Sequence, residues 1–264
     1  MTGARWTLGQ TLNVPFPEIP LAGGNASSFV ARSGDTVRKP WTISTPSVQR
    51  LLGVLRAEIG DLVPEPRGRD DQGRQVLEFV PGVETTSELP IAEAEAERTG
   101  ASIRDLHEAA ACFQRLDTDV WTAAMRRPGD EIIGHCDLAP WNLIRSRDRW
   151  AFIDWDGAGP TTKVADLAYA SRSFAQLDAD HELDESIPLL RAILTGYGAS
   201  PEDRHRILPA MIERADAMRD LLIGSVTTGV QPWASMAVSG HGDFWSAAVD
   251  HLRRHTVEIE LATR

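Results

Sequence analysis

The feature that most restricts the fold of this chain is the succession of elements between residues 131 and 157. Residues 131–133 have the apolar character of a short strand, and residues 142–145 and 150–153 form two further strands joined by a tight turn. A polar loop connects the first strand to this hairpin. The sequence therefore predicts a strand, a loop and a hairpin, with polar side chains gathered where they meet.

Three polar residues occupy matched positions around the hairpin. Asn142 and Asp154 are equally far in sequence from Asp148, its expected tip, so strand pairing should bring their side chains together at the open end. An amide oxygen and a carboxylate form a hard-oxygen site that suits Mg²⁺. We predict that Asn142 and Asp154 are metal ligands and that Asp137, on the same loop, is a catalytic base. The alternative is that all three are turn residues, because Asp and Asn favour turns.

The spacing within the loop indicates a reaction type. His135, Asp137 and Asn142 have the His-x-Asp-x-x-x-x-Asn spacing of a kinase catalytic loop, and Asp154 follows Asn142 as a later metal-binding aspartate. In such a loop the first aspartate accepts the proton of the substrate hydroxyl. His135 is expected to be a structural residue that bonds backbone around the metal loop, rather than a titrating catalyst.

Several segments together resemble a known family. Residues 135–144 (HCDLAPWNLI), 152–157 (FIDWDG) and 166–168 (DLA) resemble the aminoglycoside phosphotransferase family of the protein-kinase-like superfamily. Residues 77–82 (LEFVPG) look like its interlobe hinge, and residues 104–107 (RDLH) look like its helix before the catalytic loop.

The likeness covers roughly residues 20 to 175 and implies an α+β, protein-kinase-like fold of two lobes. We expect a small β-rich, nucleotide-binding lobe over residues 1–80. A larger, mainly helical lobe over residues 81–264 should carry the catalytic loop and the acceptor site. The family moves the γ-phosphate of a nucleoside triphosphate to a hydroxyl group, so Mg²⁺ and ATP or GTP are implied. The choice between ATP and GTP stays open because hinge contacts are mainly backbone.

The resemblance also implies roles for residues outside the loop. Asp166 should tie the metal loop to the helical body, and Asp156 is a supporting residue near the metal or the acceptor. The nucleobase should be bound by backbone atoms near three hinge residues, which are Glu78, Phe79 and Val80.

The nucleotide phosphates have two groups of candidate partners. One is a loop of small residues whose backbone can approach a phosphate closely, although such a loop is often an ordinary turn. Its candidates are Gly23, Gly24, Asn25 and Ser27. The other is a basic residue on the following strand, where Arg38 is the best match by register and Lys39 is the competitor. Strand alternation lets only one of the two face the cleft.

The elements outside the loop fit this lobe assignment. Residues 29–32 and 36–39 predict a hairpin, and residues 75–80 predict a further strand. Between them a helix is predicted, with Thr45 as its N-cap and Gly60 as its end. Helices dominate from residue 91 onward.

Two positions depart from the family pattern. Cys136 stands where the family usually has glycine, and a positive φ there would be strained. The predicted helix has Glu58 as its only carboxylate, near its end, so the expected ion pair with the phosphate-anchoring residue is absent or made differently. These departures leave a pseudokinase as an alternative, although the base and both metal ligands are present.

Composition restricts the partners. A formal net charge of −11 and only two lysines argue against nucleic acid and membrane surfaces and favour a cationic ligand, unless the acidity serves only solubility. The two cysteines and the lack of a long apolar run indicate a cytoplasmic protein. A monomer or a homodimer is expected.

The sequence leaves the acceptor open. The leading hypothesis is phosphorylation of an antibiotic, aminoglycoside-like or other, for resistance or self-protection. The alternative is a metabolite kinase that acts on a sugar, amino alcohol or amino acid hydroxyl. Candidate acceptor contacts are two acids and two aromatics that also fit a solvated loop and a helix core, namely Asp178, Asp180, Trp233 and Trp245.

Overall fold

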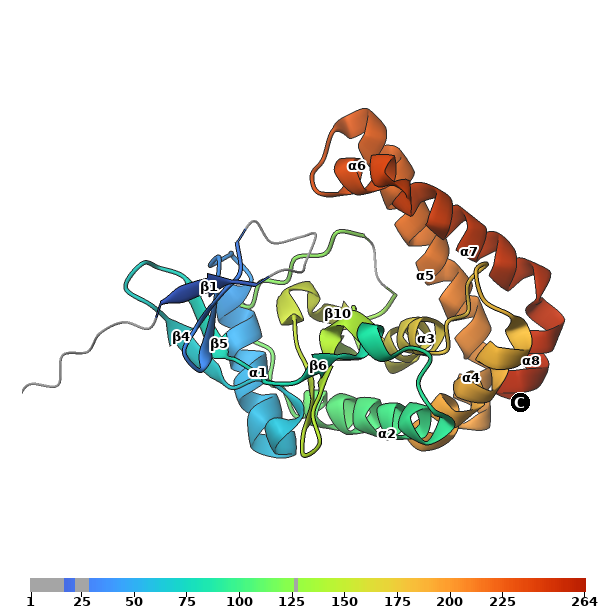
Figure 1. The fold of residues 1–264 in the computed structure, drawn as a ribbon, viewed down its shortest axis with the longest axis horizontal. Coiled ribbons are helices and arrows are strands. Elements are labelled where there is room, and N and C mark those ends of the chain that lie inside the picture. Colours follow the sequence, from blue (N-terminus) through green and yellow to red (C-terminus); the bar gives the residue numbers. More distant parts are fainter. Residues whose placement is uncertain (1–16, 22–28, 126–127) are drawn as a thin grey trace, which may run out of the picture.

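The computed structural model describes residues 17–21, 29–125 and 128–264. Within these residues a small antiparallel sheet with one helix lies beside a larger, mainly helical part (Figure 1). No helix in this described portion combines the length and apolar character that crossing a bilayer requires.

The N-terminal sheet has five strands in the order β1-β2-β3-β5-β4. The strands are β1 Glu18–Pro20, β2 Ala31–Ser33, β3 Thr36–Lys39, β4 Pro66–Arg69 and β5 Gln75–Glu78. Strands β2 and β3 form the predicted hairpin, with Ala31 opposite Arg38. Its turn is possible because Gly34 adopts a positive φ of 62°. Strand β5 ends earlier than predicted, at Glu78.

Helix α1, Thr45–Ile59, packs its apolar stripe into the interior, where Val48, Leu51 and Leu55 are at most 1% exposed. The predicted N-cap is wrong by one residue. Thr45 belongs to the helix and Ser44 is the N-cap, because the Thr45 hydroxyl accepts a hydrogen bond from the Thr42 N–H instead of capping the first turn. The helix ends at Gly60, as predicted.

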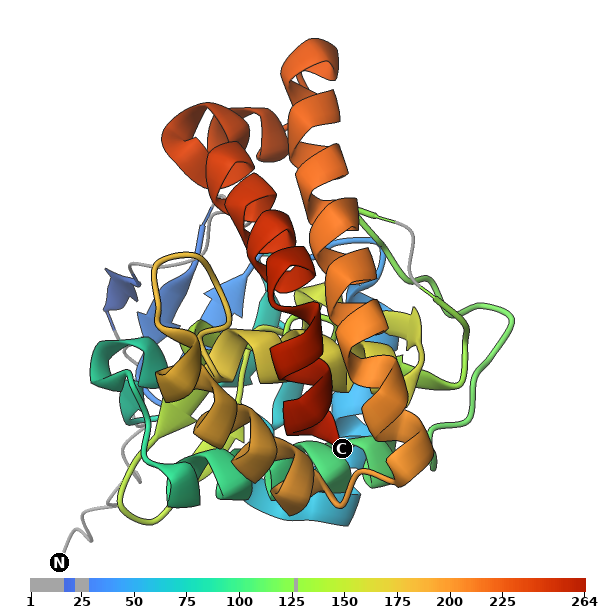
Figure 2. The same cartoon turned by 90° about the vertical axis from the view of Figure 1, so that its right-hand side faces the viewer.

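The helical part is built from α2 to α8. Their bounds are α2 Glu93–Ala110, α3 Lys163–Phe174, α4 Leu183–Tyr197, α5 Pro201–Thr228, α6 Trp233–Met236, α7 Gly242–Arg254 and α8 Thr256–Thr263. Helix α5 extends beyond the rest of the molecule, and α7 returns beside it after the short α6 (Figures 1 and 2). The predicted predominance of helices after residue 91 is confirmed.

Two small sheets carry the central loop. Strand β7, Ile132–Gly134, pairs with β10, Gly159–Thr161, and the hairpin β8, Leu143–Arg145, and β9, Trp150–Phe152, is joined by β6, Val83–Glu84. Short helical turns complete the fold. They are η1 Gly60–Leu62, η2 Thr85–Glu88, η3 Pro140–Asn142, η4 Trp155–Gly157 and a wider turn at Ala237–His241.

The hairpin is present, but its register differs from the prediction by one residue. Leu143 lies opposite Phe152, and the Ile153 N–H donates to the Asn142 carbonyl at 2.8 Å. Asn142 therefore faces Ile153 rather than Asp154. The chain turns at Asp154, which has left-handed φ and ψ of 62° and 60°, so its side chain leaves the strand direction.

Helices α2 and α4 approach each other through two glycines. A Cβ at Gly100 would lie 2.0 Å from the Ile193 carbonyl oxygen, and a Cβ at Gly196 would lie 1.8 Å from the Glu97 carbonyl oxygen. No side chain fits at such distances, so the two backbones can pack this closely only because both residues are glycine.

This contact predicts opposite effects of one substitution at two helical glycines. Gly100→Ala should lower the free energy of unfolding by about 1–3 kcal/mol, because the helices must separate. Gly53→Ala, at an exposed position of α1 with nothing within 4 Å of the new Cβ, should raise the free energy of unfolding by up to about 1 kcal/mol. Urea unfolding of both variants checks this, and equal shifts would contradict the close approach.

Candidate active site

A cleft of about 2030 Å³ lies between the sheet and the helical part. Its lining includes Val37 and Lys39 from β3, Asp137 from the central loop, and Tyr169 and Trp245 from the helices. Ligand pockets usually have roughly 300–1,000 Å³. The cleft therefore has room for two substrates, one on each side of the loop.

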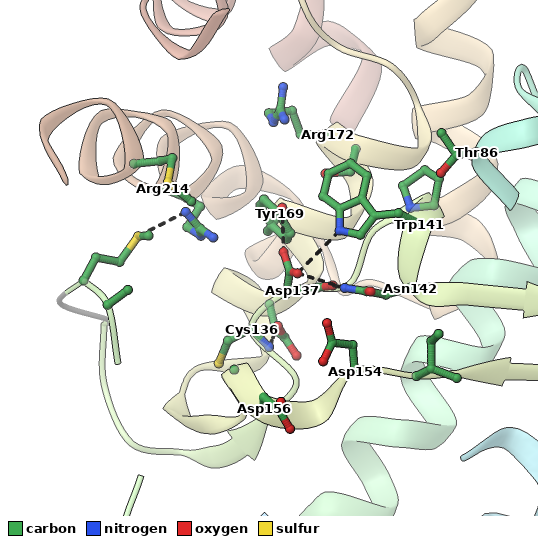
Figure 3. A pocket seen from close by; sticks show the side chains of 18 of the residues that line it. Thr86, Cys136, Asp137, Trp141, Asn142, Asp154, Asp156, Tyr169, Arg172 and Arg214 are labelled. Carbon is green, nitrogen blue, oxygen red and sulfur yellow. Dashed lines mark hydrogen bonds between the residues drawn. The ribbon is translucent and has the colours of Figure 1, made fainter. Parts of the chain in front are cut away.

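Asp137 is held in the cleft through both carboxylate oxygens (Figure 3). The Tyr169 hydroxyl donates to Oδ1 at 2.8 Å, and the Asn142 side-chain amide donates to Oδ2 at 2.8 Å. The Trp141 ring N–H lies at 3.5 Å from Oδ2. The predicted base is thus fixed in one orientation, with its carboxylate at the cleft surface.

Tyr169 was missed by the sequence analysis. Burial, followed by the neighbouring Asp137 carboxylate, raises the pKa of Tyr169 above its ordinary value, so its hydroxyl remains a donor. Residues three apart on a helix share a face, and Tyr169 follows Asp166 by three positions on α3. The three-residue spacing from Asp166 is therefore the sequence feature that could have identified Tyr169.

His135, at the start of the loop, bonds to backbone atoms through both ring nitrogens. Its Nε2 bonds the Ile153 carbonyl oxygen at 2.9 Å, and its Nδ1 accepts from the Asp137 N–H at 3.3 Å. The ring also packs on Trp155, with centroids 4.5 Å apart. His135 thereby connects the loop of Asp137 to the segment that leads into Asp154.

Asp166 is the buried anchor of the loop. Its carboxylate accepts from the N–H groups of His135, at 3.0 Å, and Cys136, at 2.8 Å, and from the His107 ring at 3.2 Å. Burial alone would raise the pKa of Asp166, but these hydrogen bonds and nearby His107 hold it below its ordinary value. We expected Asp166 to tie the metal-binding segment around Asp154 to the helical body. Asp166 instead ties the loop of Asp137 to that body, through the N–H groups of His135 and Cys136.

Cys136 has a positive φ of 65°, the conformation for which glycine was expected. Such a backbone costs about 1–3 kcal/mol for a residue with a Cβ. The bond from its N–H to Asp166 holds it in place.

Lys39, not Arg38, faces the cleft. The Lys39 ammonium lies 2.5 Å from Asp154 Oδ1 and 2.7 Å from Asp156 Oδ2. Arg38 points to the other side of β3, where its guanidinium lies 3.3 Å from Asp70. The preference for Arg38 is corrected, because strand alternation gives the cleft face to Val37 and Lys39.

Helix α1 does not supply the acid that pairs with Lys39. Asp154 and Asp156, which follow strand β9, pair with it instead. Burial would lower the pKa of Lys39 and raise that of Asp154, but their mutual attraction outweighs burial in both. The pKa of Lys39 is raised, with Asp156 contributing, and the pKa of Asp154 is lowered. Both groups are therefore charged at neutral pH.

The residues around this pair fit a magnesium ion. The Asn142 amide nitrogen is used by Asp137, which leaves the amide oxygen for a cation, and Lys39 contacts only one Asp154 oxygen. The described residues contain no cluster of three His, Cys, Asp or Glu side chains suited to a metal. Mg²⁺ requires no such cluster, since it is usually held by one or two carboxylates with substrate phosphates and water.

Comparison with known proteins agrees with this geometry. The model of the phosphotransferase enzyme family matches residues 118–209, which include the loop and the start of α5. The trifolitoxin immunity protein of Rhizobium leguminosarum bv. trifolii is 30% identical over 266 residues, covering 93% of this chain and 99% of that protein. The chain belongs to the aminoglycoside phosphotransferase family.

Solved structures confirm the kinase-like, two-lobed architecture of this phosphotransferase. A choline/ethanolamine kinase family protein from Mesorhizobium loti has a TM-score of 0.62 at 18% identity, covering 93% of this chain and 92% of that one. An amicoumacin kinase in complex with AMP-PNP and Ca²⁺ has a TM-score of 0.65 at 14% identity, with 92% and 87% covered. At these identities the likeness shows the fold.

The predicted hinge residues Glu78, Phe79 and Val80 line the same cleft as Lys39. The Glu78 N–H donates to the Glu65 carbonyl and the Phe79 N–H donates to the Asp35 carbonyl, at 2.9 and 2.8 Å. The Glu78 side chain is paired with Arg149 at 2.5 Å. Val80 is thus the hinge residue whose N–H we predict to meet a nucleobase.

The remaining predicted contacts divide into three groups. Asp178, Trp233 and Trp245 line the cleft. Asp180 is exposed and lies outside the lining, in a surface turn where its N–H donates to Asp178 Oδ1 at 3.2 Å, so its prediction as an acceptor contact is corrected. The four phosphate-loop candidates lie outside the described residues, and they are Gly23, Gly24, Asn25 and Ser27.

The contrast between two neighbouring cations predicts different effects on nucleotide binding. Lys39→Met should weaken binding of Mg²⁺-nucleotide by about 10- to 100-fold, because it removes a charge-assisted contact in the cleft. Arg38→Met should leave the affinity unchanged, since Arg38 faces away. Titration calorimetry with ADP measures both, and an equal loss would contradict the assignment of Lys39.

The buried Asp166 carboxylate should make the free energy of unfolding of the protein depend on pH. Asp166→Asn should lower the free energy of unfolding at neutral pH by about 3 kcal/mol, because an amide cannot accept from all three buried donors. The pKa of Asp166 is lowered from 3.8, so its stabilising effect is present above that pH and is lost as the pH falls below it.

Urea unfolding at neutral pH and below pH 3.8 measures this effect. The difference between the Asp166→Asn variant and the parent should shrink in acid. The exposed Asp71→Asn serves as the control. A variant difference that is the same at both pH values would show that the carboxylate charge is not what stabilises the loop.

Proposed function

We propose that this protein transfers the γ-phosphate of ATP or GTP to a hydroxyl of an antibiotic and so confers resistance or self-protection. The observation that carries the proposal is the Asp137 carboxylate, held by Tyr169 and Asn142 at the centre of a cleft large enough for two substrates. A mobile or exposed carboxylate would need ordering before each turnover. This one is already ordered.

Asp137 has the chemistry of the base. Its two oxygens each accept one short hydrogen bond, and each carboxylate oxygen has a further lone pair. The acceptor hydroxyl would donate to Asp137 and lose its proton to it as the O–P bond forms, while the γ-phosphate leaves the nucleoside diphosphate. Tyr169 and Asn142 would keep the carboxylate aimed during that step.

Lys39, Asp154 and Asn142 would serve the donor side of the cleft. Asn142 and Asp154 would hold Mg²⁺, which when bound neutralises charge on the β- and γ-phosphates. Lys39 already lies at this point with its ammonium between two carboxylates, and it would contact the phosphates. Asp156 would balance the Lys39 charge when Asp154 binds the metal.

Antibiotic modification is favoured over metabolism by a relative that matches nearly the whole chain. The trifolitoxin immunity protein matches this chain at 30% identity over 99% of its own length, and its name states protection against a toxin. A pseudokinase is disfavoured because Asp137, Asn142 and Asp154 are all present in the cleft. An acceptor from primary metabolism remains one outcome of the test.

Acceptor-dependent ADP or GDP release tests the proposal. Purified protein is assayed with Mg²⁺, nucleotide and a panel of hydroxylated antibiotics and metabolites. Asp137→Asn should reduce release by about 10²- to 10⁴-fold with nearly unchanged nucleotide affinity, because a general base contacts the acceptor. Asp154→Ala should weaken nucleotide binding itself.

Asp148→Asn, at the exposed hairpin tip, is the matched control and should retain full activity. Stimulation by an antibiotic supports resistance, and stimulation only by metabolites reassigns the enzyme to metabolism. Nucleotide binding without release for any compound, or release that survives Asp137→Asn, contradicts the proposed role of the loop.

A further inference from the structure

Three cationic side chains are buried among the described residues, and one of them has no carboxylate partner. Lys39, 6% exposed, contacts Asp154, and Arg145, 7% exposed, contacts Glu95 at 2.8 Å. Arg172 on α3 is 4% exposed, and its Nε and Nη1 make no hydrogen bond within the described residues. Buried charges in proteins are normally paired, so Arg172 is the exception in this fold.

The residues that the structure does not describe have no carboxylate side chain to offer. The residues outside the described ranges, 1–16, 22–28 and 126–127, contain no Asp or Glu. The partner of Arg172 must therefore come from another molecule, or the charge must be tolerated without one.

Aromatic contacts do not compensate for this burial. The Arg172 guanidinium lies 4.4 Å from the Trp245 ring centroid and 5.8 Å from that of Phe244, both on α7. Cation–π contacts recover only part of the free energy that is lost when a guanidinium is removed from water. The aromatic contacts therefore leave a net cost.

A second cation lies beside the first. Arg214 on α5 stacks over Tyr169 at 4.4 Å, and its Nη1 contacts only the Met125 sulfur, a weak acceptor, at 3.1 Å. Burial lowers the pKa of Arg172, and the neighbouring Tyr169 and the Asp178 carboxylate offset this only in part, while the proximity of Arg214 lowers it further. Two guanidinium groups that lack carboxylate partners therefore lie near each other, although like charges repel.

Both cations line the same cleft as Asp137, on the side away from the donor groups. In Figure 3, Arg172 and Arg214 lie on one side of Asp137, and Asp154 and Asp156 lie on the other. Arg172 follows Tyr169 by three residues on α3, which is about 4.5 Å along the helix axis. Tyr169 itself contacts Asp137 and carries Arg214 over its ring, so both cations neighbour the residue that holds the base.

We propose that Arg172 and Arg214 bind a carboxylate group of the acceptor, whose hydroxyl is then held at Asp137. The acceptor would thus be a hydroxylated acid. The part of this inference that concerns the hydroxyl rests on the proposed phosphotransfer, and the carboxylate site does not. The paired guanidinium groups offer planar, charge-assisted donors of the kind that carboxylates prefer. The Ser173 hydroxyl also lines the cleft, has no hydrogen-bond partner within residues 17–21, 29–125 and 128–264, and is a further donor.

This assignment reverses the expectation from net charge. The overall charge of −11 suggested a cationic ligand, but the acceptor side presents two guanidinium groups without an ion-pair partner among the described residues, although acids such as Asp178 also line the cleft. Local groups outweigh the net charge because interactions in water are screened beyond about 8–10 Å. An acceptor recognised only through its amino groups would leave Arg172 unpaired.

Stability of the free protein gives a first test, which needs no acceptor. Arg172→Met keeps the apolar stem against Trp245 and removes the unpaired charge, so we expect the Tm to rise by about 2–4 °C. Arg145→Met, at a similarly buried cation with two carboxylate partners, should lower the Tm by a similar amount. A fall for Arg172→Met that matches the Arg145→Met fall would make Arg172 a structural residue and overturn the proposal.

Ligand charge gives the second test. Thermal shift is measured, with Mg²⁺ and ADP present, for ω-hydroxy acids of increasing chain length, the matching hydroxy amides and the matching amino alcohols. We expect stabilisation by the acids alone, with the effect lost in Arg172→Met and retained in Arg38→Met. No acid-specific stabilisation, or one that survives Arg172→Met, overturns the proposal.

The two proposals can fail separately. Both tests here measure stability or binding and require no turnover. Acid-specific binding without nucleoside diphosphate release would support the carboxylate site and contradict the proposed phosphotransfer. Release stimulated by amino alcohols but not by hydroxy acids would support phosphotransfer and overturn the carboxylate site.

Discussion

The buried carboxylate of Asp166 is the interaction on which the geometry of the site depends. It lies on α3 and accepts from the backbone of His135 and Cys136 and from the ring of His107 on α2. Two helices and the loop of Asp137 therefore meet at one charged group. The same contacts hold Cys136 in a conformation that costs energy, which a loop open to solvent would relax.

A second charged centre joins the sheet to the helical part. Lys39 on β3 contacts Asp154 and Asp156, which follow the hairpin, and the pKa shifts of Lys39 and Asp154 show that both remain ionised. The Lys39 ammonium is buried, so these short ion pairs fix its position as well as balancing its charge. The placement of Lys39 relative to the metal loop thus depends on how the two parts of the molecule pack.

Charged side chains on the proposed acceptor side of the cleft are paired differently from those on the proposed donor side. Donor groups are paired in the free protein, whereas Arg172 is buried without a carboxylate partner among the described residues. A site that binds a charged ligand is expected to be unsatisfied before the ligand arrives, because its own charges must be available. Such local imbalance is invisible in the net charge of the chain.

The sequence alone predicted the candidate reaction centre, because the spacing of His135, Asp137 and Asn142 and the later Asp154 is set by a short loop and a hairpin, which are local. It also predicted the β2–β3 hairpin and α1. Only the tertiary structure decided which cation faces the cleft, the register that places Asn142 opposite Ile153, and the contacts of Tyr169 and Arg172. Those features depend on contacts between residues far apart in the chain, or on a single-residue shift that local propensity does not fix. The charge balance of a buried site likewise depends on which residues pack around it. Net charge therefore predicted a cationic ligand, whereas the folded cleft presents two guanidinium groups.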